Sequence, residues 1–177
     1  VVFPDDHVGQ SCWEKAEIQL LKEACDLCIR KGGIQPEQVD YLIAGDLLNQ
    51  LVCANMTARD LGVPFLGVFG ACSTMAEAVA LGAVLVDGGY ADRVCALSSS
   101  HHDTAERQYR YPVEFGSQRP PTAQWTATAA GAAVVGPPGA GRVGITHATL
   151  GRVVDWGRKD PFDMGSAMAP AAADTIA

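Results

Sequence analysis

The residues with the clearest chemical potential in this chain lie in the stretch Gly70–Thr74, which reads Gly-Ala-Cys-Ser-Thr. Its single cysteine, Cys72, stands where the apolar run 64–69 gives way to a second apolar run, 75–86, with helical character. A cysteine on such a strand-to-helix turn lies among unpaired backbone N–H groups at the positive end of the helix dipole. That environment favours a reactive thiolate and also holds anions. The pattern therefore indicates a nucleophile, an anion-binding pocket, or a cysteine that only packs.

Neighbouring polar residues fit the same chemistry. The Ser73 hydroxyl lies beside Cys72, and Asp46 ends a predicted strand, where ligand crevices form in parallel α/β sheets. Asp46 would contact an anion only if it were protonated, aimed at a ring nitrogen, or bridged by a cation such as calcium. Alternatively, it caps the following helix. The Asn49 amide would donate to a carboxylate, with a structural role as the other interpretation.

Histidine and arginine residues complete the set of candidates. His101 and His102 follow Ser98–Ser100 at the end of another predicted strand, where an imidazole would activate Cys72, donate to a ligand, or simply lie in a loop. We expect one of them, His101, in the pocket, and we assign no role to His7 or His147. The segment after them carries three arginines, which would clamp a carboxylate or lie at the surface or in a dimer contact: Arg107, Arg110 and Arg119.

Composition narrows the class of protein. The chain has 177 residues, a net charge of −7 and 48% hydrophobic residues, so it is globular and carries no basic surface for nucleic acid. Its six cysteines lie mostly in apolar periodic segments, which suits reduced thiols. We read Cys25 and Cys28, one helical turn apart, as core positions, because a single CxxC is weak evidence for a metal. The longest uncharged stretch, 120–141, contains four prolines and is excluded as a membrane span.

Hydrophobic periodicity predicts alternating helices and strands. We expect helices over about 12–31, 49–61 and 75–86, with the last apolar all round and therefore buried in the middle of the protein. Strands are predicted at 41–44, 64–69, 93–98, 125–135 and 142–154, the final two as an antiparallel hairpin around Pro137-Pro138-Gly139. Such alternation implies an α/β fold with a mixed, mostly parallel sheet flanked by helices. A helix that begins near Ala167 runs to the last residue, so we expect the chain to be a fragment.

Four long blocks of sequence resemble the stage V sporulation protein AD family, within the thiolase superfamily. They are Ala-Gly-Asp-Leu-Leu-Asn-Gln (44–50), Phe-Gly-Ala-Cys-Ser-Thr (69–74), Ala-Glu-Arg-Gln-Tyr-Arg-Tyr-Pro (105–112) and the block 160–176, which begins Asp-Pro-Phe-Asp-Met. The resemblance implies a thiolase-like layered fold built from two similar halves. Residues 1–159 would be the N-terminal half and residues 160–177 the truncated start of the C-terminal half.

The resemblance also implies a function in spore formation. Members of the family bind dipicolinic acid (pyridine-2,6-dicarboxylate) and take part in its movement into the developing spore, with other stage V sporulation A membrane proteins as partners. We therefore expect a non-catalytic protein without a cofactor or metal, whose ligand is dipicolinate or its calcium complex. The expected ligand-binding residues are Asp46, Asn49, Cys72, Ser73 and His101. We further expect a homodimer of a cytoplasmic-type soluble protein, peripheral at the inner spore membrane, with a link to germination. The alternative is an active acyl-condensing enzyme of the thiolase or ketoacyl-synthase type, with Cys72 as the nucleophile.

Overall fold

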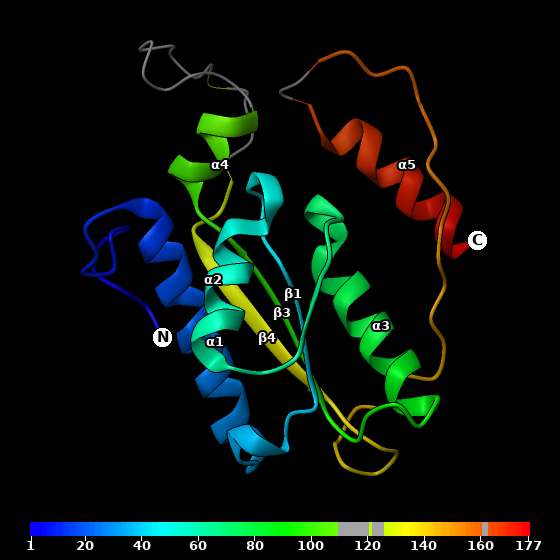
Figure 1. Ribbon diagram of the computed structural model, residues 1–177. Coiled ribbons are helices and arrows are strands. Elements are labelled where there is room, and N and C mark those ends of the chain that lie inside the picture. Colours follow the sequence, from blue (N-terminus) through cyan, green and yellow to red (C-terminus); the bar gives the residue numbers. More distant parts are fainter. Residues whose placement is uncertain (110–120, 122–125, 161–162) are drawn as a thin grey trace.

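The computed structural model describes residues 1–109, 121, 126–160 and 163–177. Helices and strands alternate through most of this part of the chain, as Figure 1 shows. In chain order the elements are α1 (Trp13–Gly32), η1 (Pro36–Gln38), β1 (Tyr41–Gly45), η2 (Asn49–Leu51), α2 (Val52–Leu61), β2 (Phe65–Gly67), η3 (Ala71–Ser73), α3 (Thr74–Asp87), β3 (Val94–Ser100), α4 (His102–Tyr109), β4 (Ala129–Val135) and α5 (Gly165–Ile176). The three η elements are single turns of 3-10 helix.

The strands form one four-stranded sheet in the order β2-β1-β3-β4. Strand β1 is parallel to both β2 and β3, with Ile43 opposite Leu66 on one side and Ala96 on the other. Strand β4 is antiparallel to β3, with Leu97 opposite Ala132. The α/β fold with a mixed, mostly parallel sheet is therefore confirmed.

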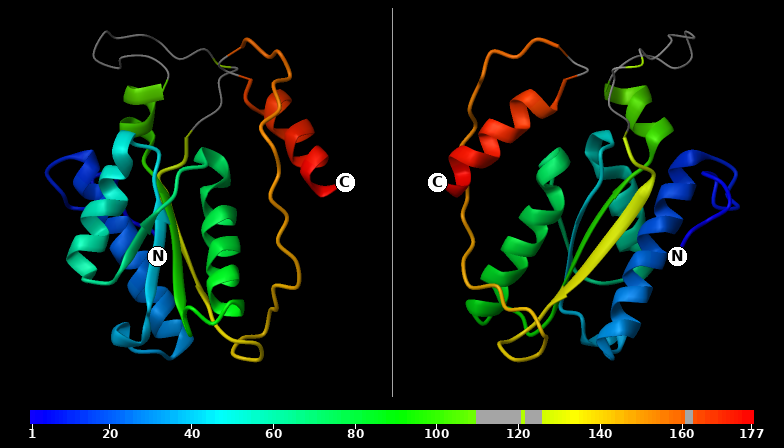
Figure 2. Two further views of the ribbon diagram at one scale, coloured as in Figure 1. Left: turned by 45° about the vertical axis from the view of Figure 1, so that its right-hand side comes forward. Right: turned by 180° about the vertical axis from the view of Figure 1, so that it is seen from behind.

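Helices cover both faces of the sheet, and side chains alternate between them. Leu42 and Ala44 of β1 pack in the core cluster that includes α1 and α2. Ile43, between them in sequence, packs with Ala78 of α3 on the opposite face. The two views of Figure 2 show the resulting layers, with α1 and α2 on one side of the strands and α3 on the other. Successive side chains along β1 or β3 thus point alternately to the layer of α1 and α2 and to the layer of α3.

Local sequence signals explain where the first helix ends. Helix α1 stops at Gly32, and Gly33 takes a left-handed conformation with φ 64°, its N–H bonded to the carbonyls of Arg30 and Ile29. A glycine adopts this conformation without the steric penalty of a side chain. The helix was predicted over about 12–31, and its predicted end is confirmed.

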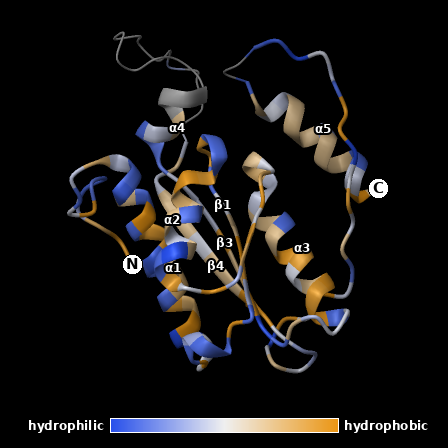
Figure 3. Ribbon diagram, viewed as in Figure 1, coloured by the Kyte–Doolittle hydropathy of each residue, from blue (hydrophilic) through white to orange (hydrophobic). Residues whose placement is uncertain are grey.

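Two predicted features differ in the structure. The hairpin of 125–135 with 142–154 is wrong, because β4 pairs with the central strand β3 and residues 142–154 contain no strand. Helix α3 is largely apolar along its length (Figure 3) but is buried only on the side that meets the sheet, at Thr74, Ala78 and Gly82. Val84, on another side of α3, is 59% exposed. Apolar composition predicted burial all round, whereas packing within this chain covers one face.

None of the helices in the described part of the chain has both the length and the apolar character that crossing a membrane requires.

Candidate functional site

The turn that carries Cys72 lies between the end of β2 and the start of α3. Val68 continues the pairing of β2 through an N–H bond to the carbonyl of Ala44, 3.1 Å. The chain then turns through η3, where Ala71 has a positive φ of 48°. A residue with a Cβ is uncommon in this left-handed region, and such conformations cluster at functional sites. The turn leaves the side chains of Cys72 and Ser73 exposed to solvent.

Close packing between β1 and α3 fixes this turn. A Cβ on Gly45, the last residue of β1, would collide with the Val68 carbonyl oxygen and lie 2.7 Å from Cγ2 of Thr74. Thr74 is 1% exposed, and its Oγ1 accepts the N–H of Gly70 at 3.1 Å. The first residue of α3 is therefore locked against the end of a core strand.

The backbone amides of the turn are less open than the sequence suggested. The N–H of Ser73 donates to the Gly70 carbonyl at 2.9 Å, and the N–H of Thr74 donates to the carbonyl of Ala71. The Ser73 hydroxyl also donates to the Gly70 carbonyl, at 2.8 Å. The expectation that these amides are unpaired is wrong for Ser73 and Thr74, because a 3-10 turn before the helix uses them internally. An anion at this turn would depend on side-chain donors and on the helix dipole.

Asp46 lies beneath the surface at the end of β1 and is 1% exposed. Its carboxylate accepts the N–H of Leu48 at 2.8 Å and the N–H of Ala54 at 2.7 Å. Burial raises the pKa of Asp46, and these backbone hydrogen bonds oppose that rise. The geometry matches the capping alternative, in which Asp46 holds the loop that leads into α2. It does not present Asp46 to a ligand as we had expected, since both carboxylate oxygens are already engaged.

Asn49 is exposed on the η2 turn that Asp46 supports. Two successive residues there, Gln50 and Leu51, have positive φ angles of 63° and 53°. The side-chain amide of Asn55 braces the turn by donating to the carbonyls of Gln50 at 2.9 Å and Leu51 at 2.8 Å. Sequence reasoning missed Asn55, although its position one helical turn after Leu51 is the spacing that such a brace requires.

His101 does not lie in the same site as Cys72. Its side chain is fully buried and packs 6.4 Å, centroid to centroid, from the ring of Trp13 at the start of α1. Its Nε2 lies 2.8 Å from the Asp6 carbonyl, and its Nδ1 accepts the N–H of Asp103 at 3.3 Å. The prediction that His101 lines a pocket with Cys72 is wrong, because His101 points to the α1 face of the sheet and Cys72 precedes the helix on the other face.

A buried polar cluster on the α1 face was also missed. Glu17 is fully buried, and its carboxylate accepts the hydroxyls of Ser99 at 2.7 Å and Thr104 at 3.1 Å. Burial raises the pKa of Glu17, and the charge of Asp46 raises it further. A single glutamate on the apolar side of a predicted helix is the sequence signal for such a cluster.

The remaining candidates add no site within the described part of the chain. Arg110 and Arg119 lie outside the described residues, as does the Arg107 side chain. Among the residues that the structure describes, only Asp5, Asp6 and His7 group closely enough to hold a metal ion, and all three are exposed. We assign no metal to them, because Asp6 already pairs with His7 at 3.0 Å.

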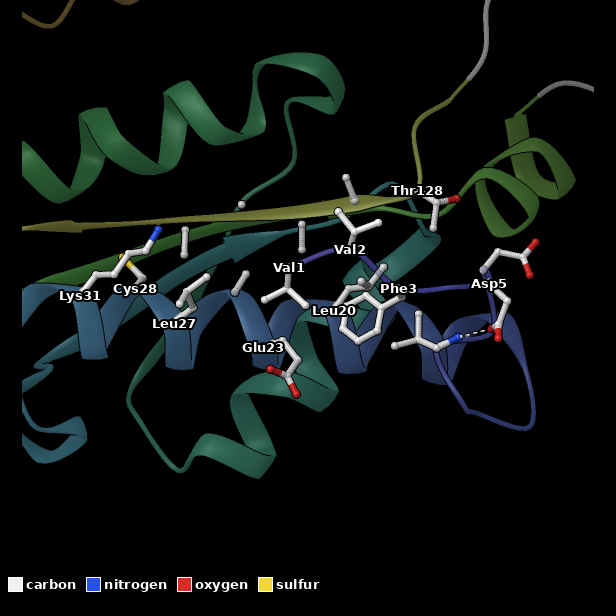
Figure 4. A pocket seen from close by; sticks show the side chains of 17 residues that line it. Val1, Val2, Phe3, Asp5, Leu20, Glu23, Leu27, Cys28, Lys31 and Thr128 are labelled. Carbon is white, nitrogen blue, oxygen red and sulfur yellow. Dashed lines mark hydrogen bonds between the residues drawn. The ribbon is translucent and has the colours of Figure 1, made fainter.

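A groove of about 580 Å³ runs between the N-terminal residues, α1 and β4. Figure 4 shows Val1, Phe3, Leu20 and Leu27 along it, with Cys28 and Lys31 at one end. None of the predicted site residues lines this groove. It is therefore separate from the Cys72 turn.

Comparison with known proteins places the chain in a family. Residues 1–177 match the family described as Stage V sporulation protein AD (SpoVAD). The chain belongs to this family. It is 53% identical over 174 residues to Stage V sporulation protein AD of Bacillus subtilis (strain 168). The aligned region covers 98% of this chain and 51% of that protein. The chain thus spans about half the length of the curated SpoVAD relative that it matches.

Solved structures share the fold of this SpoVAD chain at low sequence identity. The tetronic acid condensing enzyme AbyA1 aligns with a TM-score of 0.57 and 24% identity, over 80% of this chain and 44% of that one. The 3-oxoacyl-[acyl-carrier-protein] synthase III of Aquifex aeolicus VF5 aligns with a TM-score of 0.54 and 19% identity. This alignment covers 67% of our chain and 38% of the synthase chain. These likenesses confirm the thiolase-like fold.

Proposed function

We propose that this protein binds dipicolinic acid and supports its uptake into the developing spore during sporulation, as a non-catalytic thiolase-like protein. Membership of the SpoVAD family supports the sporulation role. The observation that carries the proposal is the exposed turn at the start of α3, which holds the Cys72 thiol and the Ser73 hydroxyl at the carboxyl end of the parallel strands. Ligand crevices of α/β sheets form at this edge.

The turn suits an aromatic dicarboxylate. Phe69, 51% exposed, stands three residues before Cys72 and offers an apolar wall for the pyridine ring. The exposed Asn49 side chain is a neutral donor for a carboxylate oxygen, and the Ser73 hydroxyl becomes a second donor when it turns away from the Gly70 carbonyl. The dipole of the 14-residue helix α3 favours negative charge at its N-terminus. Asp46 acts indirectly in this proposal, because it holds the loop on which Asn49 lies.

A non-catalytic role is supported by the surroundings of Cys72. Activation of a thiol nucleophile requires a base within hydrogen-bond reach. In the part of the chain that the structure describes, no histidine is hydrogen-bonded to Cys72, and the ring of His101 lies on the other face of the sheet.

The wider assembly is also part of the proposal. We place the protein as a homodimer, peripheral at the inner spore membrane, together with other stage V sporulation A membrane proteins. Calcium would neutralise the two carboxylates of dipicolinate, which counters the net charge of −7 on this chain.

Calorimetry of the full-length protein tests the ligand and the site. We expect dipicolinate to bind, and Cys72→Ala to weaken binding by about tenfold, which is about 1.4 kcal/mol. Because Cys72 is exposed, the melting temperature should stay unchanged. Cys12→Ala, which removes a half-buried thiol at the start of α1, is the matched control and should bind normally.

Ligand analogues and calcium sharpen this experiment. Picolinate lacks one carboxylate and benzene-1,3-dicarboxylate lacks the ring nitrogen, so both should bind more weakly than dipicolinate if both groups are recognised. Titrations with and without calcium separate the free acid from its complex. Absence of binding by the wild-type protein at millimolar dipicolinate would overturn the function. Normal binding by Cys72→Ala would overturn only the site.

A second candidate is an acyl-condensing enzyme with Cys72 as nucleophile. The exposed Cys72 thiol at the start of a helix favours it. The two solved proteins of similar fold are named as a tetronic acid condensing enzyme and a 3-oxoacyl-[acyl-carrier-protein] synthase III. Mass spectrometry after incubation with acyl-CoA distinguishes the two functions. An acyl group on Cys72 that is absent from Cys72→Ala would favour the enzyme, and an unmodified chain would favour the binding protein.

A further inference from the structure

Two buried thiols on different elements meet in the core. Cys25 on α1 is 2% exposed and Cys95 on β3 is fully buried, and both are free cysteines. Their Sγ atoms lie 3.8 Å apart although the residues are 70 positions apart in the sequence. The contact therefore exists only because α1 packs on the central strand β3.

We propose that Cys25 and Cys95 are a peroxide-sensitive pair, which a hydroperoxide oxidises to an internal disulfide that links α1 to β3. A disulfide requires a sulfur–sulfur distance of about 2.0 Å, so the two sulfurs must approach by about 1.8 Å. Each cysteine side chain has one rotatable bond through which its sulfur moves.

The reaction balances with hydrogen peroxide as the only oxidant. The Cys25 sulfur attacks one peroxide oxygen, an S–O bond forms, and the O–O bond breaks to release hydroxide, which takes up a proton as water. The Cys95 sulfur then attacks the resulting sulfenic acid, the S–S bond forms, and the S–O bond breaks to release a second water. Two thiols supply two electrons, and peroxide is reduced to two water molecules.

Either sulfur can be the donor of the hydrogen bond within the pair, and the first step falls to Cys25 when Cys95 donates. The hydrogen bond from Cys95 lowers the pKa of Cys25, although burial opposes this effect. The same interaction and burial raise the pKa of Cys95. The thiolate is the nucleophilic form, so Cys25 attacks and Cys95 resolves the sulfenic acid.

Two other cysteines compete with this pair. Cys28 lies one helical turn from Cys25, is half-buried, and faces the groove of Figure 4. Cys72 is exposed and open to direct oxidation or to disulfides between molecules. The experiment must therefore separate Cys25 from Cys28 and remove Cys72.

The test uses the full-length protein with Cys72→Ser, treated with hydrogen peroxide and digested with trypsin without reduction. Trypsin releases residues 23–30, which hold Cys25 and Cys28, and residues 94–107, which hold Cys95. We expect a linked pair of these two peptides that dithiothreitol separates. The linked pair should persist in Cys28→Ser and disappear in Cys25→Ser and in Cys95→Ala.

Three results would overturn the proposal. One is retention of free thiols at Cys25 and Cys95 under conditions that fully oxidise Cys72 in the parent protein. Another is a link that survives in Cys25→Ser, and a third is a link that is lost in Cys28→Ser, because either assigns the bond to Cys28. Circular dichroism checks that each variant is folded. If Cys95→Ala does not fold, the contrast between Cys25→Ser and Cys28→Ser still decides the outcome.

Discussion

Individual polar residues in this chain act mainly by holding loops and helices in place. Asp46 accepts two backbone N–H groups, Asn55 donates to two carbonyls, and Thr74 accepts the N–H of Gly70. Each satisfies backbone groups at a turn, where the regular bonds of helices and strands are absent. Cys72 and Ser73 remain exposed on a turn that these interactions define.

Ionisation of the buried Glu17 carboxyl lowers the stability of the folded protein, because burial disfavours its charged form. The pKa of Glu17 in the folded protein is raised above the unfolded value of about 4.3. The protonated carboxyl therefore contributes fully to the free energy of unfolding below about pH 4, and this contribution is lost as pH rises through the folded pKa. Glu17→Gln stays neutral, and the hydroxyls of Ser99 and Thr104 can donate to or accept from the new amide. We expect wild-type stability to fall relative to Glu17→Gln as pH is raised from about 4 to about 8.

Urea unfolding across this pH range measures the effect. The charged and titratable groups near Glu17 are Asp46, His101 and Cys53, and they stay the same in both proteins. Glu37→Gln, on the exposed η1 turn, is the control and should follow the wild-type curve. Parallel curves for wild type and Glu17→Gln would show that the buried carboxyl does not titrate differently in the folded state.

At the scale of elements, the position of the Cys72 turn depends on how closely α3 approaches β1. Glycines are packed both at this contact and further along α3: Gly45 of β1 meets Val68 and Thr74, and Gly82 of α3 faces Val94 of β3 and Val135 of β4. A helix that lies this close to a sheet needs small residues at the contact. The apolar sequence of α3 predicted a helix, and the glycines determine how closely that helix packs on the sheet.

Gly45→Ala tests this dependence. The added methyl group would collide with backbone atoms that cannot rotate away, so we expect the free energy of unfolding to fall by about 3 kcal/mol. Gly144→Ala is the matched control, because nothing lies within 4 Å of its Cβ position and its change should stay within about 0.5 kcal/mol. Chemical denaturation measures both. Equal stability of the two variants would show that α3 does not pack on β1 as described.

At the scale of the whole molecule, the chain has a packed sheet layer followed by an extended segment. The sheet and its helices end at Val135, and residues 136–160, which are mostly exposed, contain no helix or strand. Helix α5 contacts this segment through Arg152, whose Nε lies 3.4 Å from Asp174. Figure 2 shows α5 beyond α3, on the side away from α1.

Limited proteolysis tests the predicted division at residue 160. In the 177-residue chain, trypsin should cut first after the exposed basic residues of the extended segment, Arg142, Arg152, Arg158 and Lys159, and later after Lys22 on α1. If residues 160–177 begin a second half, the full-length protein should protect these sites. Mass spectrometry of the early fragments identifies the cuts. Equal cleavage of both proteins would contradict the division.

The sequence by itself determined the alternation of helices and strands, the mostly parallel sheet and the turn that carries Cys72. These follow from periodicity and from glycine positions, which act over a few neighbouring residues. The sequence did not identify the strand that pairs with β4. A strand next to a turn can pair with the segment after the turn or with a distant strand, and tertiary packing determines which pairing forms. Nor did the sequence separate His101 from Cys72, since a shift of one residue along a strand moves a side chain to the opposite face. The contact of Cys25 with Cys95 likewise arises only when α1 settles on the sheet.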